Sequence, residues 1–300
     1  MKWLRIPLKV RRIASIVAAI GLVFGGMVPA DATHLRGALG KATYDPVAKT
    51  VTLETQLLEA KTWTSAHTFF TFPTMYKVDR TTGAVSPVAA CTGQSTTATS
   101  AVTDSTQPLF YINSTTFVIN VNCANFNPNF DYIFSQTGSN RINGIKNSTN
   151  QTIQVEAKIR IDGINAAMTP VYHSGYMANV AYDTSGGVFS VNMNALSGGY
   201  AGGTKPVLNG DAVTYSLITD QSSAQGAYGA GRIPCSDFNL TTGVFRISST
   251  LCDVSKGDDY VKAFSGGTAT TPIYYAFKTR ATDAAGQYVT RDVLLAFADP

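Results

Sequence analysis

The chain has 300 residues, of which 44% are hydrophobic and 14% charged, with 23 Lys and Arg against 19 Asp and Glu. The first 32 residues hold five of the basic residues and one acidic residue, so the remainder carries 18 of each sign and no net charge. This balance excludes the strongly basic surface typical of nucleic-acid-binding proteins, and no nucleic-acid partner is expected.

The first 32 residues have the three-part layout of a secretory signal peptide. Basic residues precede an apolar run from Ile13 to Val28, and Ala30 and Ala32 form a small-residue cleavage site. The alternative is an uncleaved membrane anchor, but glycines interrupt the apolar run. No stretch of 18 or more apolar residues occurs after this leader, so none of the later sequence is expected to span a membrane. We therefore predict cleavage after Ala32, no transmembrane segment in the mature protein, and a secreted, extracellular or cell-surface location.

The roughly 268 residues after the leader exceed the roughly 100 residues of one small β-sandwich. We predict an all-β protein with two antiparallel β-sandwich domains, residues 33–166 and 167–300. Apolar and polar alternation in the first domain predicts strands, and a stretch rich in Ser, Thr and Ala predicts a solvated loop. The expected strands are 41–44, 51–57, 69–72, 75–78, 117–121 and 132–134, and the expected loop is 89–107.

The clearest strand signal lies at residues 153–161, where every odd position is apolar and every even position is polar or charged. A pleated strand separates these two sets onto opposite faces. We therefore predict a half-buried strand whose even face, with Glu156, Lys158 and Arg160, meets water. No stretch of ten or more residues carries a helical apolar stripe, which favours the all-β class.

The second domain shows the same period of two. Its expected strands are 188–194, 213–217, a hairpin over 238–247, 273–279 and 293–297.

Short motifs within residues 170–298 resemble the Ig-like and cadherin-like domains of exported bacterial surface proteins. The motifs are Gly210-Asp211 before Val213 to Tyr215, the stretch Phe238 to Gly243, and Ala281 to Gly286. The mature start, Thr33 to Gly37, is also similar to that of large exported multi-domain proteins, although Ala38 replaces their usual second glycine. The resemblance implies an Ig/cadherin-like second domain and a role in cell adhesion or binding.

Four cysteines fall two in each half of the chain, which allows three pairings. Export favours disulfide bonds over free thiols. The distribution favours Cys91 with Cys123 and Cys235 with Cys252.

Calcium is the candidate cofactor, because cadherins hold this ion with carboxylates. Asp258, Asp259 and Asp283 are the candidate ligands, and Asp299 stands where a linker would begin. The paired acidic motifs of calcium cadherins are missing, so solvated turn aspartates are the alternative and no cofactor is expected.

Catalytic motifs are also missing from the sequence. The histidines, His34, His67 and His173, are too scattered to propose a zinc site. No nucleophile elbow occurs, although a carboxylate pair for glycoside hydrolysis stays open because its spacing is spatial. We expect a non-enzymatic protein.

Aromatic residues in flexible segments are the candidate binding groups. Tyr200 and Tyr228 lie among glycines, Arg232 follows the second of these segments, and Trp63 lies between two threonines. Loops on a rigid sandwich often contact glycans or proteins.

We therefore expect adhesion or ligand recognition at or outside the cell surface, with an extracellular protein or a glycan as partner. A carbohydrate-active enzyme or its glycan-binding module is one alternative, and a structural subunit of a surface layer or appendage is another.

Overall fold

A computed structural model describes residues 35–61, 67–104, 110–138, 144–147, 152–172, 177–181, 183, 185–193, 195–196, 212–218, 232–268 and 271–299. The expected leader, residues 1–32, lies outside them. Residues His34–Pro300 form one compact unit.

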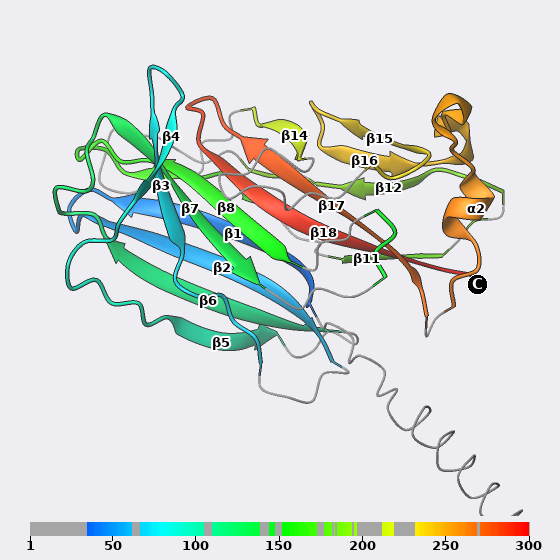
Figure 1. The fold of residues 1–300 in the computed structure, drawn as a ribbon, viewed down its shortest axis with the longest axis horizontal. Coiled ribbons are helices and arrows are strands. Elements are labelled where there is room, and N and C mark those ends of the chain that lie inside the picture. Colours follow the sequence, from blue (N-terminus) through cyan, green and yellow to red (C-terminus); the bar gives the residue numbers. More distant parts are fainter. Residues whose placement is uncertain are drawn as a thin grey trace, which may run out of the picture. The chain divides into compact units, whose positions relative to one another are not determined.

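Thirteen strands of the described residues share one large sheet, in which only β11 pairs parallel to its neighbour. The strand order is β4-β3-β7-β8-β18-β1-β2-β6-β5, with β9 on β1, β11 and β17 on β18, and β14 on β17 (Figure 1). The strands are β1 (Leu35–Asp45), β2 (Thr50–Ala60), β3 (Thr74–Asp79), β4 (Val85–Val88), β5 (Thr99–Asp104), β6 (Phe110–Asn120), β7 (Phe130–Gly138), β8 (Ile153–Arg160), β9 (Ala167–Met168), β11 (Met177–Ala181), β14 (Thr214–Ile218), β17 (Ile273–Thr282) and β18 (Tyr288–Ala298).

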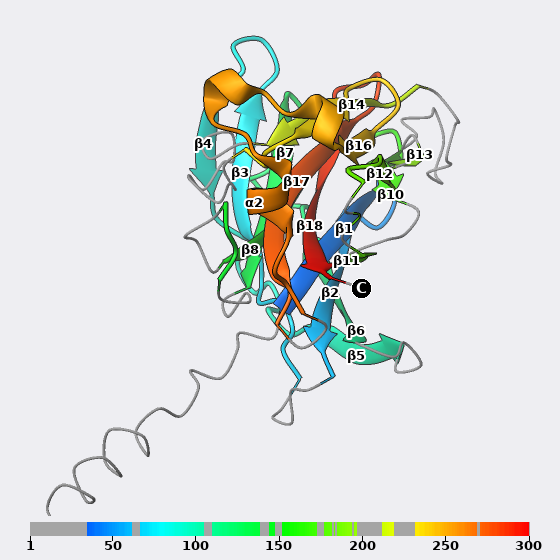
Figure 2. The same ribbon diagram turned by 90° about the vertical axis from the view of Figure 1, so that its right-hand side faces the viewer.

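The large sheet divides into two layers at β18. One edge of β18 pairs with β17 along the whole hairpin. The other edge pairs with β8 at Tyr288 and Val289, and then with β1 beside Arg291 and Asp292. Figure 2 shows β3, β4, β7 and β8 on one side of β18, and β1, β2, β5 and β6 on the other. This antiparallel, layered arrangement confirms the all-β prediction.

The two layers meet closely at Gly40 of β1. A Cβ at this position would lie 2.8 Å from Cγ1 of Val155 in β8, closer than real side chains approach. Glycine at this position therefore leaves room for the Val155 side chain against β1. The core between the layers is apolar and aromatic; among its buried members are Tyr44, Leu53, Phe117, Phe134, Ile159, Phe277, Val289 and Phe297.

The strand β8 has the predicted alternation, but the prediction that its even face meets water is wrong for part of its length. Gln154 and Glu156 are 0% and 1% exposed. The cause is tertiary, because β17 and β18 continue the sheet beside β8. Lys278 of β17 donates from Nζ to Gln154 Oε1 at 3.0 Å.

The remaining elements form two small sheets and three short helices. The order of the three-stranded sheet is β12-β16-β15, and β10 pairs with β13. These elements are β10 (Val171–Tyr172), β12 (Phe189–Asn192), β13 (Ala195–Leu196), β15 (Ser236–Asn239), β16 (Val244–Ile247), the 3-10 helices η1 (Ser249–Leu251) and η2 (Val254–Lys256), and α2 (Tyr260–Phe264).

Both predicted disulfides are confirmed. Cys91–Cys123 ties the segment after β4 to the chain beyond β6, and Cys235–Cys252 ties the start of β15 to the end of η1.

Two local predictions are wrong. Residues 69–72 are not a strand, although Phe70 is buried against Leu35 and Ile153. The expected loop 89–107 contains β5, an edge strand that pairs with β6. Its Ser, Thr and Ala side chains carry little β signal, so only pairing with a long neighbour reveals the strand.

The expected boundary between residues 166 and 167 falls inside the large sheet. Strand β18 from the second segment pairs with β8 and β1 from the first, and β17 pairs with β18. Hydrogen bonds thus join strands of the two segments in one sheet. Among the described residues, no helix has the length and apolar character needed to cross a membrane.

Candidate binding site

Five connections of the large sheet lie at one end of it, because antiparallel neighbours start and stop together. The register pairs Asp45 with Thr50, Asp131 with Arg160, and Thr282 with Tyr288. We call this region the turn end; it comprises residues 46–49, 80–84, 121–129, 161–166 and 283–287. The connections can be followed in Figure 1 from the ends of β1, β3, β6, β8 and β17.

Three of these connections begin with the same local device. In each of Asp45, Asp79 and Asp162, the Oδ1 atom accepts backbone N–H groups two and three residues later, at 2.8 to 3.0 Å. Aspartate favours such turns because its short side chain satisfies the backbone locally. The Thr82 and Thr81 N–H groups hold the pKa of Asp79 below its ordinary value.

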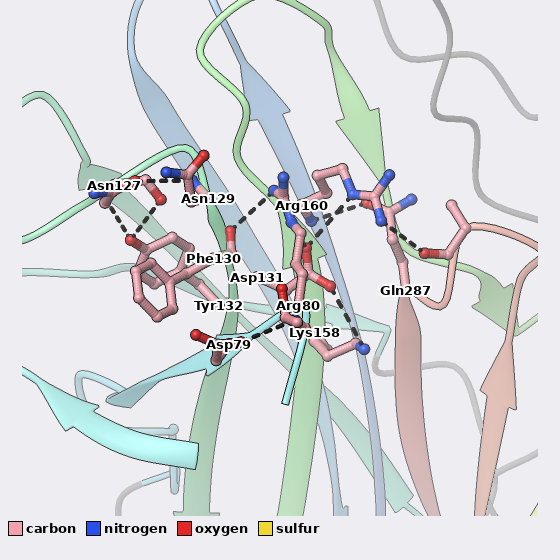
Figure 3. A network of polar contacts seen from close by, with 12 residues as sticks. Asp79, Arg80, Asn127, Asn129, Phe130, Asp131, Tyr132, Lys158, Arg160 and Gln287 are labelled. Carbon is pink, nitrogen blue, oxygen red and sulfur yellow. Dashed lines mark hydrogen bonds and ion pairs between the residues drawn. The ribbon is translucent and has the colours of Figure 1, made fainter. Parts of the chain in front are cut away.

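A buried carboxylate, Asp131, is the centre of the polar network drawn in Figure 3. Its Oδ1 atom lies 2.7 Å from Arg80 Nε and 3.5 Å from Arg160 Nε, and its Oδ2 atom lies 3.6 Å from Lys158 Nζ. The Asp131 side chain is 7% exposed. Three cations, one from the β3–β4 turn and two from β8, therefore converge on one carboxylate.

The same arginines link neighbouring connections. Arg80 donates from Nη2 to the Phe130 carbonyl at 3.0 Å. Arg160 donates from Nη2 to the Ala285 carbonyl at 3.3 Å, and its backbone N–H donates to Gln287 Oε1 at 3.1 Å. The network thus braces the β3–β4 and β17–β18 turns against β7 and β8.

The β6–β7 loop has its own brace. The Tyr132 hydroxyl accepts from the Asn127 N–H at 2.5 Å and donates to the Asn127 carbonyl at 3.0 Å. Its ring packs on Phe126, with ring centroids 4.9 Å apart. The loop is therefore held in one position at both its backbone and its aromatic side chain.

A pocket of about 250 Å³ opens at the turn end. Aromatic and aliphatic groups and the disulfide form much of it, and an ammonium and an amide supply polar groups. It is lined by Tyr44, Lys49, Val121, Asn122, Cys123, Phe126, Pro128, Ile161 and Gly163. Three connections therefore contribute to a single cavity that combines aromatic rings with hydrogen-bonding groups.

The Lys49 ammonium is the strongest donor of this pocket. It donates to the Gly163 carbonyl at 2.5 Å, and no ion pair joins it to a carboxylate among the described residues. Burial raises the pKa of the Tyr44 hydroxyl, and the negative charges of Asp162 and Asp45 raise it further. These two carboxylates therefore place negative charge near the Tyr44 hydroxyl in the pocket lining.

Two exposed aliphatic side chains lie on the connections beside the pocket. Val47 is 73% exposed and Ile164 is 77% exposed. Each lies two residues after the aspartate that begins its turn. The hydrogen bond from Lys49 to the Gly163 carbonyl joins the two turns.

Arg232, a predicted binding residue, and Asp258, a predicted calcium ligand, pair with each other. The Arg232 guanidinium forms a bidentate pair with Asp258, with Nη1 to Oδ1 at 2.7 Å. Asp258 also accepts the N–H groups of Cys235 and Asp253. Burial raises the pKa of Asp258, but these hydrogen bonds and the Arg232 charge outweigh burial and lower it. The pair stabilises the disulfide-linked segment around η1 and η2.

The other candidate calcium ligands also have local structural roles. Asp259 caps α2 by accepting the Lys262 N–H at 3.1 Å. Asp283 accepts the backbone N–H of Gln287 at 2.9 Å and its side-chain amide at 3.0 Å, and burial raises the Asp283 pKa. Asp299 accepts the Gly266 N–H. In the part of the chain that the structure describes, no three His, Cys, Asp or Glu side chains are grouped to hold a metal.

The remaining predicted site residues, Trp63, Tyr200 and Tyr228, lie outside the described residues, as do His34 and His173. His67 is described and contacts the buried Glu59, with Nδ1 and Oε2 2.6 Å apart. Asn113 and the Thr68 N–H also bond this carboxylate.

The sequence prediction named none of the pocket residues as a binding group, and identified Cys123 only for its disulfide. Aspartate followed by turn residues at 45 and 162 could have marked the two connections. No sequence pattern, however, places Phe126 beside Tyr44, because the β6–β7 loop and β1 come together only in the folded chain.

Comparison with protein-family models finds no match to this chain, and a search of curated proteins also finds none. The chemistry of the described residues is thus the basis for assigning a function.

Proposed function

We propose that this protein is an exported, non-enzymatic recognition protein that uses its turn end to bind a sugar ring of an extracellular glycan. The pocket at Tyr44, Lys49 and Phe126 carries this proposal. The wider context would be adhesion at or outside the cell surface. The Ig/cadherin-like character of residues 170–298 is consistent with that role and belongs to the same proposal.

Two features support a location outside the cytoplasm. The layout of residues 1–32 is typical of a cleaved leader. The two disulfides favour an oxidising compartment, because cytosolic thiols are kept reduced.

The chemistry of the pocket suits a pyranose. A sugar ring has an apolar face that packs on aromatic side chains, and hydroxyls at its rim that accept and donate hydrogen bonds. Tyr44 and Phe126 supply rings, while Lys49 and Asn122 supply polar groups. Because Asp45 and Asp162 place negative charge near the Tyr44 hydroxyl, a neutral ring suits the pocket better than an anion.

The rigidity of the turn end supports binding. Ordering a loop costs free energy at the moment of association, and a site ordered in advance avoids that cost. The Tyr132 hydroxyl orders the β6–β7 loop, and Asp45 and Asp162 order the turns that they begin, before any ligand arrives.

Binding is favoured over hydrolysis by the lining of the pocket. Glycosidases need two carboxyl groups flanking the scissile bond. The described lining residues include no carboxylate. Of the three glutamates, Glu54 pairs with Lys41, Glu59 contacts His67, and Glu156 lies near Arg280.

A glycan array followed by calorimetry tests the proposal. The mature protein should bind at least one neutral glycan, and Lys49→Gln should weaken binding about five- to tenfold, the worth of roughly one hydrogen bond from a charged donor. Asn122→Trp should block the pocket and abolish binding.

Lys256→Gln is the matched control, because Lys256 is 60% exposed and pairs with Asp253 away from the pocket. It should bind as the wild type does. An array without any hit, or equal affinity of Lys49→Gln and the wild type, would refute the pocket as the site. Release of reducing ends from a bound glycan would instead indicate the enzyme alternative, and concentration-dependent assembly in light scattering would indicate the structural subunit.

A further inference from the structure

Four cationic side chains lie along one face of β7, β8, β18 and β17 and the adjoining β3–β4 turn. Arg80, Lys158, Arg160 and Arg280 are 27%, 19%, 28% and 21% exposed. The register places Lys158 opposite Tyr288 and Arg280 opposite Thr290, so these side chains share a face with Asp131 and Glu156. None of the four lines the turn-end pocket.

The carboxylates of this face lie deeper than the cations. Asp131 and Glu156 have side chains that are 7% and 1% exposed, and Asp283 is 7% exposed. Asp79, next to Arg80, has its Oδ1 engaged by the Thr81 and Thr82 N–H groups. Solvent therefore meets mainly positive charge, and the balancing negative charge is buried beneath it.

An aromatic ring helps to hold two of the cations in place. The Arg280 guanidinium lies 4.0 Å from the centroid of the Tyr288 ring, and Lys158 Nζ lies 5.6 Å from it. The Tyr288 hydroxyl lies 3.4 Å from Glu156 Oε2. These contacts fix the positions of the charges, so little side-chain freedom is lost on binding.

The cations also repel one another. The pKa of Lys158 lies below its ordinary value, mainly because of burial, and the charges of Arg280 and Arg160 lower it further while Asp131 opposes the shift. A negative ligand across this face would relieve that repulsion.

We infer that this cationic face binds an acidic polysaccharide, through carboxylate or sulfate groups spaced along its chain. The row of fixed guanidinium and ammonium groups suits repeated anions, because arginine binds carboxylate and sulfate-like groups through paired N–H donors. The disulfides favour a compartment outside the cytoplasm, where acidic polymers of this kind are carbohydrates rather than nucleic acids.

Affinity chromatography of the mature protein on heparin and on polygalacturonate tests this inference, with dextran as the neutral control. The protein should be retained on at least one acidic polymer, released by salt, and not retained on dextran. Arg280→Gln should elute at lower salt, and the slope of log K against log salt should fall by about one for the charge removed.

Arg280→Lys keeps the charge and should restore most of the retention, which separates a charge effect from a folding defect. Arg246→Gln is the matched control, because Arg246 is 46% exposed and pairs with Asp237 on the small sheet; it should elute as the wild type does. Absence of retention, or identical elution of Arg280→Gln and the wild type, would overturn the inference. Tighter retention on DNA or polyglutamate than on both polysaccharides would overturn the assignment to carbohydrate. Lys49→Gln should leave retention unchanged, so this test fails or succeeds independently of the pocket.

Discussion

At the scale of single residues, Asp131 does more than any other side chain to define the turn end. Its one carboxylate faces Arg80 of the β3–β4 turn and both Lys158 and Arg160 of β8. A buried ion pair is weak evidence for net stability, because burying the charges costs desolvation free energy. Removing one partner, by contrast, destabilises the protein, because it leaves the other buried charges without compensation.

Asp131→Asn should therefore lower the free energy of unfolding by about 3 kcal/mol. Three cations would then remain close together without the carboxylate. Urea denaturation measures the change. Asp237→Asn is the control, because the Asp237–Arg246 pair is solvent-exposed and should cost less than about 1 kcal/mol. Equal losses in the two variants would contradict the role assigned to Asp131.

At the scale of elements, β18 is the strand on which the others depend. Its two edges pair with β17, β8, β1 and β11. Most of its side chains are buried, both apolar ones such as Val293 and Phe297 and polar ones such as Arg291 and Asp292. Such a strand has no solvent-exposed face, and it can be accommodated only when layers cover both of its sides.

The disulfides stabilise elements that lie further from β18. In the chain-entropy model, a loop of 32 residues at Cys91–Cys123 contributes about 4 kcal/mol and one of 17 residues at Cys235–Cys252 about 3 kcal/mol.

The double variants Cys91→Ala/Cys123→Ala and Cys235→Ala/Cys252→Ala should therefore both unfold at lower urea, with the larger loss in the first. Reduction of the wild type should reproduce their combined effect. A wild type whose unfolding midpoint is insensitive to a reductant would contradict the contribution given to the bridges.

At the scale of the whole molecule, thirteen strands of the described residues belong to one sheet. The layers that begin at β1 and at β8 are both completed by β18, which comes last in the chain. A fragment that ends at residue 166 would lack β17 and β18. The edges of β1 and β8 would then expose unpaired N–H and C=O groups.

Residues 33–166 expressed alone should therefore not fold, whereas residues 33–300 should unfold in one cooperative transition. Circular dichroism and calorimetry measure both outcomes. A folded fragment with its own melting transition would show that the first segment is autonomous, and would support the two-domain division.

Local patterns in the sequence anticipated much of the secondary structure. The alternation at Ile153 to Ile159 identified β8, because a strand has a period of two whatever its neighbours are. The cysteine distribution indicated both disulfides. The weak signal of β5 and the buried Phe70 were misread, because edge pairing and burial are set by distant partners.

The site was harder to anticipate than the fold. Arg232 and Asp258 were interpreted separately, as a ligand contact and a metal ligand, yet they bind each other across 26 residues of sequence. The pocket joins Tyr44, Phe126 and Ile161 from three connections. Contacts of this kind depend on strand order and register, which a period of two does not encode.

The sequence by itself determined the all-β class and the alternation of the strands, and favoured one pairing of the cysteines, since these follow from neighbouring side chains, turn residues and composition. Only the tertiary structure decided that β18 joins both layers, that Gln154 and Glu156 are buried, and which side chains form the pocket and the cationic face. The physical reason is that hydrogen-bonded register and layer packing bring together residues more than a hundred positions apart, such as Lys278 and Gln154.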